Sequence, residues 1–257
     1  MIQLERITFH YEKHLPLFEE FSWQVARGQS WAVIGPSGCG KSTLLYLLAG
    51  LQHPQQGTLR INGEALNAPR PSTGLILQDY GLLPWSTVRQ NVRLGLALRK
   101  FYGPDGKHTP AAGVPPQQEK AVDQWLERLG IAAIAEKFPG QISGGQRQRA
   151  AIARTLLLEP DLLLMDEPFA SLDTPTREDL QQLVHTLAAE RPLTTVSVTH
   201  TIDEALFLGE KILVLKNGGN RAPLVLENPF SGQSASQNEP AYQALTARIR
   251  EALRESA

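Results

Sequence analysis

The sequence predicts an α/β fold built on a parallel β-sheet. Apolar segments of strand character alternate with segments of helical periodicity along most of the 257 residues, and a glycine-rich turn follows one of these strands. The length allows one large domain or two small ones, and a composition of 42% hydrophobic and 20% charged residues is ordinary for a soluble globular protein.

Short alternating segments predict β-strands near the beginning of the chain. They are IQLERITFHY (2–11), FSWQVARGQSWAVIG (21–35) and GTLRINGEAL (57–66). In the last of these, Asn62 and Gly63 form the expected turn between two short strands. The apolar run TLLYLLAG (43–50) predicts a helix that ends at Gly50.

Helices and strands alternate in the remaining chain. We expect helices over 88–98, 119–129 and 175–190, another after the glycine pair at 144–145, and strands at GLILQ (74–78), LLLMD (162–166), TVSVTH (195–200) and KILVLKN (211–217). The segment 101–118 is rich in proline and glycine and is expected to be a surface loop. A polar linker from Asn228 to Pro240 precedes an amphipathic helix, AYQALTARIREALRE (241–255).

The bulk properties exclude several classes of protein. A formal net charge of −1 gives no global field that favours nucleic acid or an anionic membrane as partner. A single cysteine excludes an internal disulfide framework and suits a reducing cytosol. The N-terminus lacks the pattern of a signal peptide, and no run of 18 apolar residues occurs, so we do not expect the chain to span a membrane by itself.

The segment GPSGCGKST follows the apolar strand SWAVI and fits the P-loop pattern G-x-x-x-x-G-K-[ST]. Its residues are Gly35, Pro36, Ser37, Gly38, Cys39, Gly40, Lys41, Ser42 and Thr43. Glycines let backbone N–H groups surround a phosphate, and the helix N-terminus adds its positive dipole end. Lys41 is expected to neutralise the β and γ phosphates of a nucleotide, and Ser42 to bind Mg²⁺. The alternative is a glycine-rich turn that arose by chance.

Polar side chains follow three of the expected strands. Asp166 and Glu167 end LLLMDE, Gln78 ends GLILQ, and His200 ends TVSVTH. In a parallel sheet, ligands bind at this edge. Asp166 suits the Mg²⁺ shell and Glu167 the general base that polarises water, while Gln78 is expected to bring an amide oxygen to Mg²⁺ and His200 to donate to the γ-phosphate. Without the P-loop, we would expect Asp166 and Glu167 to be a solvated acidic pair and His200 to be a structural histidine.

The stretch ISGGQRQR (142–149) predicts a helix start that carries two glycines. Ser143 is the expected N-cap, and Gln146 completes a capping box. Gly144 and Gly145 then fall in the first turn, where each costs roughly 1 kcal/mol relative to alanine. Taken alone, this segment is an unusual cap.

Together these motifs resemble the ATP-binding cassette, the nucleotide-binding subunit of ABC transporters. The motifs in order are the P-loop, Gln78, ISGGQ, LLLMDEP, SLD (171–173) and His200, and the resemblance covers residues 2 to about 216. It implies an α/β P-loop NTPase fold with a RecA-like core sheet, an antiparallel β subdomain and an α-helical subdomain inserted at about 86–158. The ATPase domain would occupy 1–227, with a linker and C-terminal helix at 228–257.

The resemblance also implies roles for further residues. Tyr11 stands where an aromatic ring stacks on adenine, and Asp173 belongs to a loop that couples two sites. The signature ISGGQ supplies Ser143, Gly144, Gly145 and Gln146, with Ile142 where leucine is usual. Two cassettes dimerise head to tail, and each signature helix directs its bare amides at the ATP held by the other subunit. A side chain at the glycines would hold that phosphate off.

A finer resemblance concerns the transported solute. The segment LLPW (82–85), with MDEPFASLD, resembles the nitrate, sulfonate and taurine importer group. The long 101–118 segment and KNGGNRAPLVLE (216–227), which lacks the usual Arg-Pro-Gly turn, depart from that group. Trp85 lies where the family's groove receives a permease helix, unless it packs into its own subunit. Cys39 lies near a helix N-terminus, which can lower a thiol pKa; the alternative is an inert small side chain.

The resemblance implies an ATP-hydrolysing, energy-coupling subunit of an ABC importer for such solutes. The implied partners are a second cassette, a separate transmembrane permease and a solute-binding protein, at the cytoplasmic face of the membrane. A first alternative is a soluble cassette that acts on nucleic acid or ribosomes, which the near-neutral charge and the lack of a basic arm disfavour. A second is a metabolic P-loop kinase, which would lack the signature and SLD.

Overall fold

The computed structural model describes residues 1–11, 16–102, 116–222, 224–233 and 239–254. In this part of the chain, a six-stranded sheet has the order β10-β9-β3-β8-β7-β6. All neighbours pair in parallel except β9 and β10, which are antiparallel. The strands are β3 (Ser30–Ile34), β6 (Thr73–Ile76), β7 (Leu162–Asp166), β8 (Thr194–Thr199), β9 (Lys211–Val214) and β10 (Leu224–Glu227). The parallel sheet predicted from the sequence is confirmed.

A smaller antiparallel sheet has the strand order β2-β1-β4-β5 within the described residues. Its strands are β1 (Ile2–Phe9), β2 (Phe18–Val25), β4 (Gln56–Ile61) and β5 (Glu64–Ala65). Asn62 and Gly63 form the expected turn between β4 and β5, and both have positive φ angles, 53° and 82°, as a type I′ hairpin turn requires.

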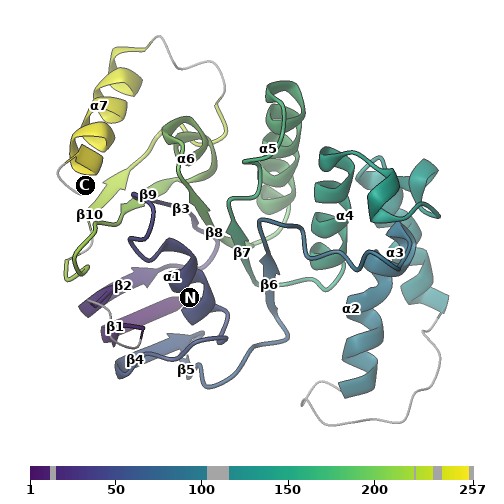
Figure 1. Ribbon diagram of the computed structural model, residues 1–257, viewed down its shortest axis with the longest axis horizontal. Coiled ribbons are helices and arrows are strands. Elements are labelled where there is room, and N and C mark those ends of the chain that lie inside the picture. Colours follow the sequence, from purple (N-terminus) through teal and green to yellow (C-terminus); the bar gives the residue numbers. More distant parts are fainter. Residues whose placement is uncertain (12–15, 103–115, 223, 234–238, 255–257) are drawn as a thin grey trace.

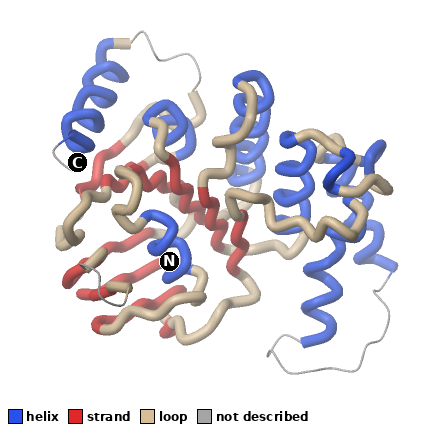
Figure 2. The backbone as a smooth tube through the Cα atoms, in the orientation of Figure 1, coloured by secondary structure: helices blue, strands red, loops and turns tan. Residues whose placement is uncertain are grey.

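The helices lie in separate parts of the molecule (Figure 1). They are α1 (Lys41–Leu48), α2 (Val88–Tyr102), α3 (Pro116–Arg128), α4 (Gly144–Leu156), α5 (Thr174–Ala189), α6 (Ile202–Leu208) and α7 (Pro240–Arg254), with 3₁₀ turns at Ala132–Ile134 and Pro139–Gln141. Helices α2, α3 and α4 form a group at one end of the six-stranded sheet, and α7 lies at the other end. Helix α1 lies between the two sheets (Figure 2).

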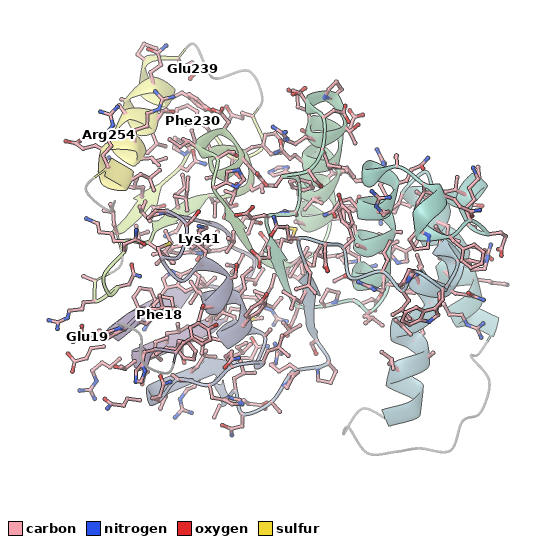
Figure 3. All side chains as sticks on the ribbon, viewed as in Figure 1. Phe18, Glu19, Lys41, Phe230, Glu239 and Arg254 are labelled. Carbon is pink, nitrogen blue, oxygen red and sulfur yellow. The ribbon has the colours of Figure 1, made fainter. Side chains whose placement is uncertain are left out.

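Three clusters of buried apolar side chains join the helices to the two sheets. The first joins α2–α5 to β6 and β7, and the second joins α1 to both sheets. The third packs α6 and α7 on one face of β3, β9 and β10, and Phe230 lies beside the C-terminal helix in it (Figure 3). Helix α7 buries Tyr242, Leu245 and Ile249 in this cluster, so it is part of the packed structure.

Several details differ from the sequence-based expectations. Helix α6 and strand β10 were not predicted, α2 continues to Tyr102 beyond the expected end at 98, and α3 begins at Pro116, before the expected start at 119. Residues 103–115, which hold most of the expected surface loop, lie outside the described residues. Residues 228–233 of the expected linker contact α6, because Asn228 Nδ2 donates to the carbonyls of Leu206 (2.7 Å) and Gly209 (2.5 Å). No helix in the described ranges has both the length and the apolar character needed to cross a membrane.

Candidate functional site

The P-loop connects β3 to α1 in a conformation that needs glycine. Gly40, the N-cap of α1, has φ 105°, and a Cβ there would lie 3.2 Å from the Phe18 ring. At Gly35 a Cβ would lie 2.7 Å from the carbonyl oxygen of Leu215. Lys41 is 8% exposed, and its Nζ donates to the carbonyl oxygens of Gly35 and Pro36, both at 2.9 Å. The loop is thus closed around its own lysine, which faces the place a phosphate would take.

An open cavity of about 790 Å³ adjoins the P-loop, a size within the range of ligand sites. It is lined by Tyr11, Pro16, Leu17, Ser37, Gly38, Gly40, Lys41, Ser42, Thr43, Glu167 and Gly218. Tyr11 is part of this wall, and its hydroxyl lies 3.2 Å from Thr43 Oγ1. A phosphate chain would find a lysine and backbone amides at one end of the cavity and an aromatic ring within the wall.

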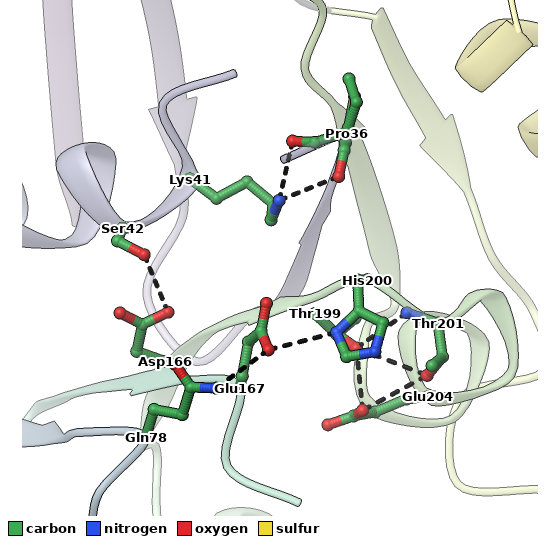
Figure 4. A network of polar contacts seen from close by, with 11 residues as sticks. Pro36, Lys41, Ser42, Gln78, Asp166, Glu167, Thr199, His200, Thr201 and Glu204 are labelled. Atoms are coloured by element: carbon green, nitrogen blue, oxygen red, sulfur yellow. Dashed lines mark hydrogen bonds and ion pairs between the residues drawn. The ribbon is translucent and has the colours of Figure 1, made fainter. Parts of the chain in front are cut away.

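Asp166 and Ser42 face one another beneath the P-loop (Figure 4). Ser42 Oγ donates to Asp166 Oδ1 at 3.1 Å, and Asp166 is 6% exposed. Burial raises the pKa of the Asp166 carboxyl, against the opposing effects of the Ser42 hydrogen bond and the Lys41 charge. A hydroxyl and a carboxylate oxygen so placed match the oxygen ligands that Mg²⁺ takes in P-loop enzymes.

Glu167 is held between two side chains from other strand ends (Figure 4). Its Oε2 lies 3.2 Å from His200 Nδ1 and accepts from Gln78 Nε2 at 3.5 Å. The backbone of Glu167 has φ 46°, an uncommon conformation for a residue other than glycine, and its N–H donates to Val198 O at 3.0 Å. The structure therefore brings Gln78, Glu167 and His200 together at the carboxyl edge of the sheet.

The signature segment lies elsewhere on the same chain. Ser143 caps α4 by accepting from Gln146 N at 3.3 Å, while Gln146 Oε1 accepts from Ser143 N at 3.0 Å, so the predicted capping box is present. Ser143 and Gln146 are not among the described residues that line the P-loop cavity. Gly145 is buried, and a Cβ on it would lie 2.5 Å from Thr176 Cγ2 of α5, so packing within one chain already demands a glycine there.

Gly144 has more room than its neighbour. A Cβ there would lie 3.4 Å from Leu172 Cδ2 and 3.5 Å from the Tyr80 hydroxyl, which are ordinary contact distances. Asp173, expected to couple two sites, caps α5 by accepting from Thr176 N at 3.4 Å, and the Thr176 hydrogen bond lowers its pKa.

The surroundings of two further residues, Asn220 and Cys39, are visible only in the structure. Asn220 is buried, and its side chain donates to the carbonyls of Leu17 (2.9 Å), Cys39 (3.1 Å) and Lys216 (3.1 Å), which fixes the P-loop to the β9–β10 connection. Its only sequence signal is the turn composition of NGGN. Cys39 is 1% exposed, and burial raises the pKa of its thiol, which favours the inert small side chain over a reactive thiol.

The fold and the site define a P-loop nucleoside triphosphatase, because the loop that bears Lys41, the hydrogen-bonded pair of Ser42 and the buried Asp166, and Glu167 between two side chains meet at the carboxyl edge of a parallel sheet. The family model described as "ABC transporter" matches residues 18–170. The chain belongs to the ABC transporter family. It is an ATP-binding cassette that hydrolyses ATP, and the fold and function classes expected from the motifs are confirmed.

Known proteins resemble the chain over most of its length. It is 33% identical to an aliphatic sulfonates import ATP-binding protein, SsuB, of Bacillus cereus, over 96% of this chain and 94% of that protein. It is 38% identical to the taurine import ATP-binding protein TauB of Yersinia pestis bv. Antiqua (strain Antiqua), over 88% and 83%. A dimeric structure of an ATP-binding cassette in a post-hydrolysis state, bound to ADP and Pi, superposes with a TM-score of 0.74 at 29% identity, over 88% of this chain and 98% of that chain.

Proposed function

We propose that this cassette powers the import of an aliphatic sulfonate or taurine-like solute. The chain is the ATPase subunit of an ABC importer, and cassettes of this family work as dimers with a membrane permease. SsuB and TauB carry sulfonate and taurine import in their names. Nitrate, the third solute of the group expected from LLPW, is named by neither of these two relatives.

The contact of Glu167 with both Gln78 and His200 is the observation that carries the proposed chemistry. Glu167 lines the same cavity as Lys41 and accepts a proton from the attacking water as general base. His200 donates a hydrogen bond to the γ-phosphate, and Gln78 helps to orient the attacking water. Lys41 leaves the two P-loop carbonyls and pairs with the phosphates, while the glycine-rich backbone N–H groups bind their oxygens.

Ser42, Asp166 and Gln78 are the proposed ligands of Mg²⁺. A bound Mg²⁺ would neutralise part of the negative charge on the phosphates. Deprotonation of Asp166 is costly in the free chain because the carboxyl is buried, so a cation beside it favours its charged form.

We infer that the signature serves the ATP of the partner cassette. Ser143 to Gln146 are not among the described residues that line their own P-loop cavity, which supports a role at the ATP of a second chain. Asp173, at the start of α5, lies in the loop proposed to couple the two sites. Tyr11 would stack on the adenine. A dimeric post-hydrolysis cassette among the similar structures supports a two-chain arrangement.

The proposed assembly has two cassettes on a separate permease at the cytoplasmic face of the membrane, with a solute-binding protein on the opposite side. Residues 1–227 would be the ATPase domain, with the helical part at about 86–158. Trp85 is 73% exposed, which favours permease contact over packing into its own subunit. The near-neutral net charge gives no support to nucleic acid as partner.

Reconstitution of the cassette with its permease and solute-binding protein tests this proposal. ATPase activity should rise when the binding protein carries an alkanesulfonate or taurine, and phosphate serves as the control anion. Glu167→Gln should bind ATP and abolish the stimulated activity. Stimulation by nitrate alone would reassign the solute, and stimulation by RNA or ribosomes without any permease would favour the rival function.

A further inference from the structure

The loop that carries His200 is held by hydroxyl groups on both sides. Thr199 Oγ1 and Thr201 Oγ1 both donate to Glu204 Oε2, at 2.8 Å and 3.3 Å, and Thr201 N donates to Thr199 Oγ1 at 3.1 Å (Figure 4). Glu204 is 4% exposed and lies in the first turn of α6. The position of His200 therefore depends on where α6 begins.

The first turn of α6 is tied in turn to the C-terminal helix. Tyr242, in the first turn of α7, donates its hydroxyl to Asp203 Oδ1 at 3.1 Å, and Asp203 directly precedes Glu204. Burial raises the pKa of Tyr242 to about 12, with the Asp203 charge adding to the effect, so the phenol keeps its proton at physiological pH.

Helix α7 is itself a firm anchor for this hydrogen bond. Tyr242 is 7% exposed and packs against Phe230 with ring centroids 5.4 Å apart. Further along α7, Leu245 and Ile249 are buried in the third apolar cluster together with Ala205 and Leu206 of α6. The apolar contacts fix how α6 and α7 face one another, and the hydroxyl fixes the end of α6 nearest His200.

Side chains do not fill all of the space beside the N-terminal end of α6. A cavity of about 250 Å³ lies there, lined by Arg177, Thr201, Asp203, Glu204, Tyr242 and neighbouring side chains. The second carboxylate oxygen of Glu204 has no hydrogen-bond partner among the described residues, and burial raises the pKa of this carboxyl. Where side chains do not interlock, a few directed hydrogen bonds decide the position of a loop.

We propose that Tyr242 is a positioning residue that sets the orientation of His200 through Asp203 and the Glu204–threonine contacts. The C-terminal helix thereby acts on ATP hydrolysis from outside the nucleotide cavity. The inference rests on the proposed role of His200 in hydrolysis.

The test compares two hydroxyl deletions on one helix. Tyr242→Phe removes the hydrogen bond to Asp203. Thr246→Val is the matched control, because Thr246 lies one turn further along α7, is also 7% exposed, and its hydroxyl has no partner in the described part of the chain. In the assembled transporter, Tyr242→Phe should lower kcat about fivefold, the factor that corresponds to the loss of one ordinary hydrogen bond, with KM for ATP unchanged. Thr246→Val should leave kcat and KM at wild-type values.

The same pair is then measured in a His200→Ala background. If Tyr242 acts through His200, Tyr242→Phe should cause no further loss of kcat there. An equal loss in both backgrounds, or an equal loss from Thr246→Val, would overturn the inference. If His200→Ala itself leaves hydrolysis intact, the proposed role of His200 fails. A normal kcat for Tyr242→Phe beside a strongly slowed but measurable His200→Ala would refute the positioning role alone.

Discussion

The two signature glycines should respond differently to the same substitution. Alanine in a helix is favoured over glycine by about 1 kcal/mol, an effect that applies to both positions. At Gly144 the new Cβ would meet only ordinary contacts of 3.4 Å or more, so Gly144→Ala should raise the free energy of unfolding by up to about 1 kcal/mol. At Gly145 the Cβ would lie 2.5 Å from Thr176 Cγ2. Overpacking of this kind costs about 1–3 kcal/mol, so Gly145→Ala should lower stability by up to about 2 kcal/mol.

Urea unfolding of the purified chain measures these changes, and ATPase activity of the assembled transporter measures function. Thr176→Ser removes the methyl group that meets the new Cβ and keeps the hydroxyl, so it should restore the stability of Gly145→Ala. Gly144→Ala should lose ATPase activity without any loss of stability, because its side chain would stand between the α4 amides and the partner's ATP. Full activity of Gly144→Ala would refute the shared-site reasoning. A Gly145→Ala chain as stable as wild type, unaffected by Thr176→Ser, would refute the packing argument.

Four more outcomes are expected. Lys41→Ala and Ser143→Arg should each inactivate the homodimer. A mixture of the two with verified subunit exchange should regain ATPase activity, because one site of the mixed dimer has an intact P-loop and an intact signature. No recovery over either mutant at equal total protein would contradict the sharing of sites. Trp85→Ala should weaken co-purification with the permease and leave ATP binding unchanged, because the ring is 73% exposed, and the reverse pattern would reject the docking role. Burial raises the pKa of Asp166 above its ordinary 3.8, so the folded chain binds more protons than the unfolded chain and loses stability as the pH rises from 3.8 through the folded-state pKa. Asp166→Asn should remove this loss, so its free energy of unfolding should exceed that of wild type more at pH 7 than at pH 4, and it should abolish hydrolysis. Cys39 should react slowly with maleimide both with and without MgATP, since its thiol is buried with a raised pKa, and fast labelling that nucleotide prevents would show that the P-loop opens in solution.

Patterns within short stretches of sequence were enough to predict several local features of the fold and the site. The glycines of the P-loop, the capping box at Ser143 and the Asn62–Gly63 turn are set by sterics and hydrogen bonds within a few residues, and the structure has all three. Helix α6 was missed because seven residues give too short a period to recognise. Strand β10 was missed because its residues follow a glycine-rich turn and pair only at the edge of the sheet.

The sequence by itself determined which groups could act on ATP and which strand ends bear them. Only the tertiary structure decided that Gln78 and His200 meet at Glu167, since that contact depends on β6, β7 and β8 lying side by side in the sheet. The same holds for the Gly145–Thr176 approach, the Asn220 contacts and the link from Tyr242 to Asp203. Each joins segments whose separation along the chain carries no local signal, because the free energy that brings them together comes from burying apolar faces of whole helices and strands.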